Sequence, residues 1–131
     1  MEYRKLFEQF DQSGRLVLPD QETVFAEIPW TKHTSFEGVE LKHIITSKQT
    51  GGQFSFHLVR IAPNKKIGRH IHEAQLETHE VISGSGVCIH GQTEIRYEPG
   101  VISIFPIAAP HEVLAGGTGL YLFAKFFPAL V

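Results

Sequence analysis

The chain has 131 residues and a formal net charge of −2, with 42% hydrophobic and 20% charged residues. This length fits one compact domain, and the balance is that of a globular protein rather than a disordered or fibrous one. The near-neutral charge provides no basic surface for nucleic acid, and no apolar run is long enough for a transmembrane helix. We therefore expect neither a nucleic-acid partner nor a membrane partner.

Two further features of the composition bear on location and function. The N-terminus lacks the hydrophobic core of a signal peptide, and Cys88 is the single cysteine, so it has no partner for an intramolecular disulfide. Both observations favour a cytoplasmic location. Histidine is the unusual residue type, with eight copies against one Met, one Trp and one Cys. The positions of these histidines direct the search for a site.

The N-terminal part, residues 1–30, is predicted to form a short arm and the first strands of the same domain as residues 31–131. Apolar residues between Leu6 and Phe10 show a weak helical spacing, and residues 11–14 are typical of a turn. We expect an arm that is exposed or only partly packed.

From residue 15 onward the pattern is that of short strands. Phe54, Phe56 and Leu58 alternate with other residues and so share one strand face, and Gly, Pro or Asn ends each run. Strands are predicted at 15–18, 23–28, 39–46, 53–61, 66–72, 77–83, 87–90, 93–97, 101–105, 111–114 and 120–127. Glycines are expected to break the chain at 84–86 and 116–119, and residues 91–92 suit a tight hairpin turn. Such a chain must pack sheet on sheet or close into a barrel.

The pair His70 and His72 is the focal feature. Residues two apart on a strand point to the same face, whereas on a helix they point to nearly opposite sides, so the pair can chelate only if the segment is extended. Glu77 follows after a short link that can turn the chain and bring a carboxylate beside the two imidazoles. His111 lies further on, behind a Gly and Pro-rich segment.

These spacings resemble the two motifs of the cupin superfamily. The first motif matches at His70, His72, Glu77 and Gly84, and the second matches at Gly100, Pro106 and His111. Three motif positions depart from the pattern, since Asn64 and Ala108 replace glycines and Ala115 replaces an asparagine. None of them is a metal-ligand position, and the two loop changes are expected to alter turn geometry only slightly.

The resemblance implies an all-β fold, the double-stranded β-helix or jelly-roll barrel of cupins. It also implies that His70, His72, Glu77 and His111 hold one divalent transition metal inside the barrel. Three imidazoles and one carboxylate suit Fe, Mn, Ni, Cu or Zn without selecting among them. The alternative is a cupin that has lost its metal and uses these residues as polar packing.

The alternation of side chains between the two faces of a strand adds candidates around the metal. If Glu77 faces inward, so does His79, which is our candidate for a catalytic acid or base, with a ring packed in the barrel wall as the alternative. By the same argument Gly68 and Lys66 are expected to face inward with His70. Val113 should share the inward face of His111.

The other candidates are interpreted as structural. His57 faces either the pocket or solvent, with solvent favoured, and Lys125 is expected to face solvent rather than an anionic ligand. Cys88 is read as a small buried hydrophobe. The remaining histidines are placed at the surface, and several phenylalanines in the core or an interface: His33, His43 and His90; Phe54, Phe56, Phe105, Phe123, Phe126 and Phe127.

The functional expectation is a metal-dependent cupin enzyme acting on a small, oxygen-rich molecule by oxygenase or isomerase-type chemistry. The alternative is a non-enzymatic cupin that binds or senses a small ligand. A homodimer is also expected, because small barrels expose edges and the aromatic residues of the first thirty positions can cover a partner's sheet. In the competing interpretation this segment folds over its own barrel.

Overall fold

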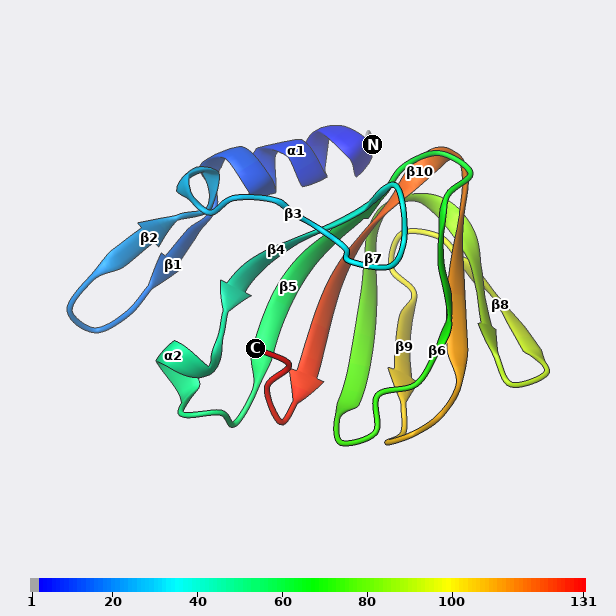
Figure 1. Cartoon of the computed structure of the whole chain (residues 1–131). Helices are drawn as coiled ribbons and strands as arrows, with labels where there is room; N and C mark the ends of the chain where they lie inside the picture. Colours follow the sequence, from blue (N-terminus) through cyan, green and yellow to red (C-terminus); the bar gives the residue numbers. More distant parts are fainter. Residues whose placement is uncertain (1–2) are drawn as a thin grey trace.

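The computed structural model describes residues 3–131, which form ten strands, two α-helices and one 3-10 helix. The helical elements are α1 (Tyr3–Ser13), the 3-10 helix η1 (Phe25–Glu27) and α2 (Ser47–Thr50). The strands are β1 (Arg15–Val17), β2 (Glu22–Val24), β3 (Thr31–Lys32), β4 (Val39–Ile45), β5 (Ser55–Ile61), β6 (Lys66–His70), β7 (Leu76–His90), β8 (Thr93–Tyr97), β9 (Ile102–Phe105) and β10 (His111–Phe127). The strands from β3 to β10 form one sheet that closes into a barrel, and β1 and β2 form a separate hairpin (Figure 1). The expected all-β jelly-roll architecture is confirmed.

The barrel closes because two long strands belong to both of its walls. β10 pairs with β5 through its second half and with β6 through its first half, while β7 runs antiparallel beside it along both halves. Remaining partners extend the walls, so that β3 and β4 continue outward from β5, and β8 and β9 pair with β7. Figure 1 shows the two long strands bending together across the barrel.

Glycines allow this bend without ending the strands. Gly84 has a φ of 86°, and a Cβ there would lie 2.1 Å from the carbonyl oxygen of Gly119, which itself has a φ of 81°. The pairing of β7 with β10 shifts register between Ala115 and Leu120, beside this contact. The predicted strand breaks at 84–86 and 116–119 are therefore wrong, because these glycines permit a bend and a close approach instead. The predicted hairpin turn at 91–92 is confirmed, since His90 pairs with Thr93.

The N-terminal segment forms a layer over the outer face of the sheet. Residues expected to be a loose arm and a turn are helical through Ser13, and Phe7 is buried against Tyr121, with ring centroids 4.1 Å apart. This helix covers the strands in Figure 1. Phe7, Phe25 and the partly buried Trp30 belong to a core cluster that lies outside the barrel. The segment thus folds over its own barrel.

A buried ion pair fixes this layer. Lys42 of β4 donates from Nζ to Asp11 Oδ1 and, over 2.8 Å, to the carbonyl oxygen of Phe25. Both charged side chains are largely withdrawn from water, since their exposed fractions are 3% and 11%. None of the helices in the described part of the chain is long and apolar enough to cross a membrane.

Candidate metal centre

Four candidate ligands meet inside one end of the barrel. His70 is the last residue of β6, His72 lies just beyond it, Glu77 is the second residue of β7, and His111 opens β10. One ligand atom from each residue lies within 4.8 Å of the others, so the group can hold a metal ion. The sequence prediction therefore brought together four residues that do gather in space.

Backbone carbonyls orient two of the imidazoles. His70 Nδ1 lies 2.7 Å from the carbonyl oxygen of Gly68, and His111 Nδ1 lies 3.1 Å from that of Ala109. A carbonyl can only accept, so each Nδ1 carries the hydrogen and each Nε2 keeps a lone pair. Phe105 stacks on the His111 ring at a centroid distance of 4.1 Å and an interplanar angle of 16°. Both rings are thereby held in the form that binds a metal.

Two buried polar atoms test whether a metal fits here. Among the described side chains, Glu77 Oε1 and His111 Nε2 are the buried atoms that lack a hydrogen-bond partner. They lie 2.9 Å apart, and His72 Nε2 is 3.5 Å from the same carboxylate oxygen. Leaving such atoms unpaired costs free energy, and a cation between them would satisfy both. The donor set of three nitrogens and one oxygen fits a divalent transition metal.

The protonation states agree with this fit. Burial lowers the pKa of His70 and of His72, so both rings are neutral near pH 7. Burial of Glu77 opposes its ionisation, but the neighbouring His79 and His111 outweigh burial and hold the pKa of this carboxyl well below its usual range. Neutral imidazoles and an ionised carboxylate are the ligand forms that a metal requires.

His79 lies behind Glu77. Its Nε2 is 2.9 Å from Glu77 Oε2, and its Nδ1 is 2.9 Å from the hydroxyl of Tyr97. All three side chains are buried. The predicted inward direction of His79 is confirmed, and both of its ring nitrogens are engaged by these partners.

Parity fails in β6, where a bulge changes which side chains face inward. His70 pairs with His111 and Ile67 pairs with Val113, so the stretch from Ile67 to His70 in β6 has one residue more than the stretch of β10 opposite it. Ile67 lines the cavity beside the ligands, whereas Lys66 is exposed. The expectation that Lys66 shares the inward face of His70 is therefore wrong, whereas a Cβ at Gly68 would face the ring of Phe36, which packs against the interior core. Val113 is fully buried, as predicted.

A small cavity of about 70 Å³ adjoins three of the four candidate ligands, His70, His72 and Glu77. Its wall is mostly apolar, and His33 and Leu130 reach it from outside the strands. The other lining residues are Leu41, Val59, Ile67, His70, His72, Glu77, His79, Leu122, Ala124 and Phe126. The expected surface position of His33 is wrong, since it is half-buried and lines this cavity, and Leu130 was missed by sequence reasoning. Neither residue stands near the motifs, and only the folded chain brings them here.

The expected surface position of His57 is wrong. His57 is completely buried, with Nε2 2.8 Å from Ser55 Oγ and Nδ1 2.7 Å from His43 Nδ1. Its ring packs against Phe126 on the inner side of β5.

Two other residues were interpreted as structural. Cys88 is buried, as predicted. Lys125 contacts Glu80 over 2.5 Å and lies above two phenylalanine rings.

Two motif departures occupy strained positions. Asn64 and Ala108 both have positive φ, 62° and 63°, in the left-handed region that favours glycine. Asparagine tolerates this region, whereas alanine adopts it at a cost. The amide of Ala108 donates to the carbonyl oxygen of His72 over 2.9 Å, which ties this turn to a candidate ligand. Both positions thus have a backbone conformation that favours glycine, the residue of the motif.

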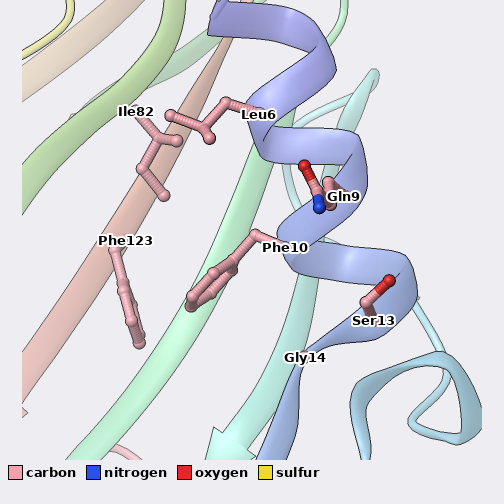
Figure 2. Close-up of a pocket in the computed structure, with 7 residues that line it drawn as sticks. All are labelled: Leu6, Gln9, Phe10, Ser13, Gly14, Ile82 and Phe123. Atoms are coloured by element: carbon pink, nitrogen blue, oxygen red, sulfur yellow. The ribbon is translucent and has the colours of Figure 1, made fainter.

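A larger hollow of about 650 Å³ lies on the other side of the sheet, between α1 and the outer strands. Figure 2 shows Leu6 and Phe10 of the helix facing Ile82 and Phe123. Among the described residues, those that line this hollow have no titratable side chain.

Comparisons with known proteins agree with the fold and the motifs. The family described as Cupin domain matches residues 57–122, about half of the chain. The chain therefore belongs to the cupin family. A search of curated proteins finds no match.

Solved structures share the fold at low sequence identity. A predicted oxalate decarboxylase from Thermotoga maritima has a TM-score of 0.71 and 20% identity, over 79% of this chain and 95% of that one. An RmlC-like cupin from Shewanella frigidimarina has a TM-score of 0.70 and 13% identity, over 92% and 96%. A sugar phosphate isomerase from Silicibacter pomeroyi has a TM-score of 0.68 and 22% identity, over 78% and 72%.

Proposed function

We propose that this chain is a metal-dependent enzyme acting on a small molecule by oxygenase or isomerase-type chemistry. The observation that carries the proposal is the pair of buried, unpaired atoms, Glu77 Oε1 and His111 Nε2, among three imidazoles and one carboxylate. A site that served only as polar packing would need a hydrogen on His111 Nε2 to bridge the 2.9 Å to Glu77 Oε1, but the contact of Nδ1 with the carbonyl oxygen of Ala109 places the hydrogen of the neutral ring on Nδ1. Solved cupins of similar fold, by their names, include a decarboxylase and an isomerase.

In the proposed site, four residues bind the metal and the apolar wall of the cavity excludes water. His70, His72, Glu77 and His111 would hold the ion, Fe, Mn, Ni, Cu or Zn. A divalent metal held here supplies a Lewis-acid centre with positions open to a substrate oxygen. The apolar side chains Val59, Leu122 and others of the cavity exclude water from the bound ligand.

His79 is the proton-handling residue of the proposal. Its Nε2 faces Glu77 Oε2 and its Nδ1 faces the hydroxyl of Tyr97. A proton held on Nε2 therefore passes first to the Glu77 carboxylate rather than directly to a ligand in the cavity. Any acid or base work by His79 depends on this carboxylate.

A second candidate is a protein that binds or senses a small ligand without converting it. The mostly apolar lining favours it, because beyond the four ligands the titratable groups that line the cavity are His33 and His79. The two candidates share the metal and differ only in turnover.

Analysis of the products distinguishes the enzyme from the ligand-binding protein. The protein is loaded in turn with Fe, Mn, Ni, Cu and Zn and incubated in air with a panel of small carbonyl, enol and catechol compounds. Products that have gained oxygen support an oxygenase, and products of unchanged mass but new structure support an isomerase. Binding without conversion by every metal form contradicts the enzyme and supports the sensor. His111→Ala, which removes one ligand, serves as the inactive control.

A homodimer and a cytoplasmic location belong to the same proposal. The aromatic side chains first considered for a partner lie mainly in the chain's own outer core. The dimer thus rests on the exposed apolar residues Ile102 and Ile104 of β9, which are 69% and 61% exposed. Light scattering at micromolar concentration tests it, and a mass equal to one chain contradicts it.

A further inference from the structure

The C-terminal tail, residues 128–131, follows β10 and turns back toward the lower end of β5 (Figure 1). Leu130 in this tail lines the cavity beside the candidate ligands and packs against the interior core. It is the one lining residue that comes from the tail. The size of the cavity therefore depends on where a short terminal segment is held.

Hydrogen bonds from several segments hold the tail in place. The amide of Leu130 donates to Ser55 Oγ over 2.8 Å, and the amide of Ala129 donates to the carbonyl oxygen of Gly52 over 3.0 Å. The last carbonyl, that of Val131, accepts from the amide of Ser47 over 2.8 Å and from its hydroxyl over 3.0 Å. Gln75 adds a longer contact of 3.5 Å from Nε2 to the carbonyl oxygen of Ala129.

The hydrogen bond at Leu130 is backed by two histidines. Ser55 is completely buried, and its hydroxyl also contacts His57 Nε2, which in turn contacts His43 through the other ring nitrogen. Burying a hydroxyl and an imidazole is costly unless both are paired. Here the chain of hydrogen bonds from His43 through His57 and Ser55 ends at the amide of Leu130. These polar groups therefore stabilise the position of the tail.

The cavity that Leu130 completes is small and poor in hydrogen-bonding groups. Its volume of about 70 Å³ compares with ~300 to 1,000 Å³ for pockets that bind drug-sized ligands. Beyond the four metal ligands, its polar lining groups are His33 and His79. The amide of Ser35 donates to His33 Nδ1, so the hydrogen of His33 is on Nε2, and both nitrogens of His79 are engaged. Beyond the metal ligands, the lining side chains therefore offer a ligand one free donor, His33 Nε2–H.

We infer that Leu130 is the size-determining residue of the metal pocket, and that the ligand has one oxygen-bearing end and a short apolar body. This inference rests on the proposed function, because the oxygen-bearing end must face the metal ligands. A sugar would leave most of its hydroxyls unpaired against Val59, Leu122 and Phe126, at a cost that the cavity cannot offset. The inference thus narrows the oxygen-rich substrates to short carboxylate-like molecules.

Straight-chain monocarboxylates from acetate to hexanoate test this directly. Their dissociation constants are measured by calorimetry on the full chain loaded with Zn, after the metal content of each protein has been determined. We expect acetate and propionate to bind the wild type, with at least about a tenfold loss of affinity by hexanoate. Leu130→Ala should reverse the tenfold loss of affinity for the longer acids, and Leu130→Phe should lower the affinity for propionate by a similar factor. Val131→Ala, a neighbouring side chain that does not line the cavity, should match the wild type.

The two levels of the proposal fail in different ways. If all four proteins hold one equivalent of metal but show the same dependence on chain length, or bind no carboxylate, Leu130 does not set the size of the pocket. A wild type that takes up no metal overturns the proposed function and this inference with it. Opposite shifts in Leu130→Ala and Leu130→Phe support the inference, because loss of folding cannot produce both.

Discussion

Glu77 Oε2 accepts a hydrogen bond from His79 Nε2 over 2.9 Å, and the other carboxylate oxygen, Oε1, lies among the candidate metal ligands. One carboxylate therefore faces two ways, toward the barrel wall and toward the metal centre. The hydroxyl of Tyr97, 2.9 Å from His79 Nδ1, extends this contact. His79 and Tyr97 thus orient the carboxylate, and in this role they are positioning residues.

Removal of the Tyr97 hydroxyl tests this role. Tyr97→Phe frees His79 Nδ1 and loosens the orientation of Glu77, so we expect the affinity for Zn to fall by about tenfold. Competition with a chelator measures that affinity. Tyr121→Phe removes a phenol hydroxyl outside the site and should leave the affinity unchanged. Equal Zn affinities in Tyr97→Phe and the wild type would show that the hydrogen bond does not orient the carboxylate.

Acid should destabilise the metal-free protein through His57. Burial lowers the pKa of His57 to about 4, and the nearby His43 adds to the effect while Glu77 opposes it. In the unfolded chain, His57 takes up a proton near the ordinary histidine pKa of 6.5. Above that pH, neutral His57 therefore makes its full contribution to the free energy of unfolding. It is lost as the pH falls toward 4, and amounts to about 3 kcal/mol from a shift of this size.

Urea unfolding between pH 4.5 and 7, with a chelator present, measures this contribution. His57→Gln cannot take up the proton, so its free energy of unfolding should fall less steeply with acid than that of the wild type. Some slope remains, because burial also lowers the pKa of His33, His43, His70 and His72. Identical slopes in the two proteins would contradict the assignment to His57.

Replacing Ala108 with glycine should stabilise the fold. A φ of 63° costs alanine about 1 to 2 kcal/mol of steric strain, which glycine avoids. Glycine also increases the conformational entropy of the unfolded chain, which offsets part of this gain. We expect Ala108→Gly to raise the free energy of unfolding by about 1 kcal/mol. The next residue has ordinary negative φ, so Ala109→Gly should not stabilise. A gain of equal size in both variants would argue against relief of strain.

The buried ion pair should be essential for packing the N-terminal helix. Asp11→Asn leaves the ammonium of Lys42 buried without its carboxylate, and we expect a loss of about 3 kcal/mol in the free energy of unfolding. Glu22→Gln breaks the exposed pair with Arg15 and should cost less than about 1 kcal/mol. Thermal and urea unfolding compare the two. Similar small losses would mean that Lys42 reaches water when Asp11 is neutralised.

The local spacing of His70, His72 and Glu77 indicated a site at the ends of neighbouring strands, and the resemblance to the cupin motifs added the distant His111. It could not predict that His57 is buried, because alternation identifies two strand faces but does not say that both are covered. Here the barrel interior covers the face of His57, and the N-terminal layer covers the face of Leu58. Gly84 and Gly119 were taken for breaks because a turn and a bend use the same residue type.

The remaining gaps concern contacts between distant segments. Leu130 stands 53 residues after Glu77 in the chain, yet both line one cavity. No periodicity encodes such a meeting, since it depends on how β10 ends and where the tail turns. The bulge in β6 is similar, because the extra residue is visible only in the pairing of His70 with His111.

The metal content of the protein tests the central claim most directly. The chain is purified without a chelating tag, dialysed against each of Fe, Mn, Ni, Cu and Zn, and analysed by elemental mass spectrometry. We predict close to one equivalent of at least one of these metals per chain in the wild type and in His90→Ala, a matched variant outside the ligand group. His70→Ala and His111→Ala should each lose it. A wild type that retains none of the five metals would contradict the account.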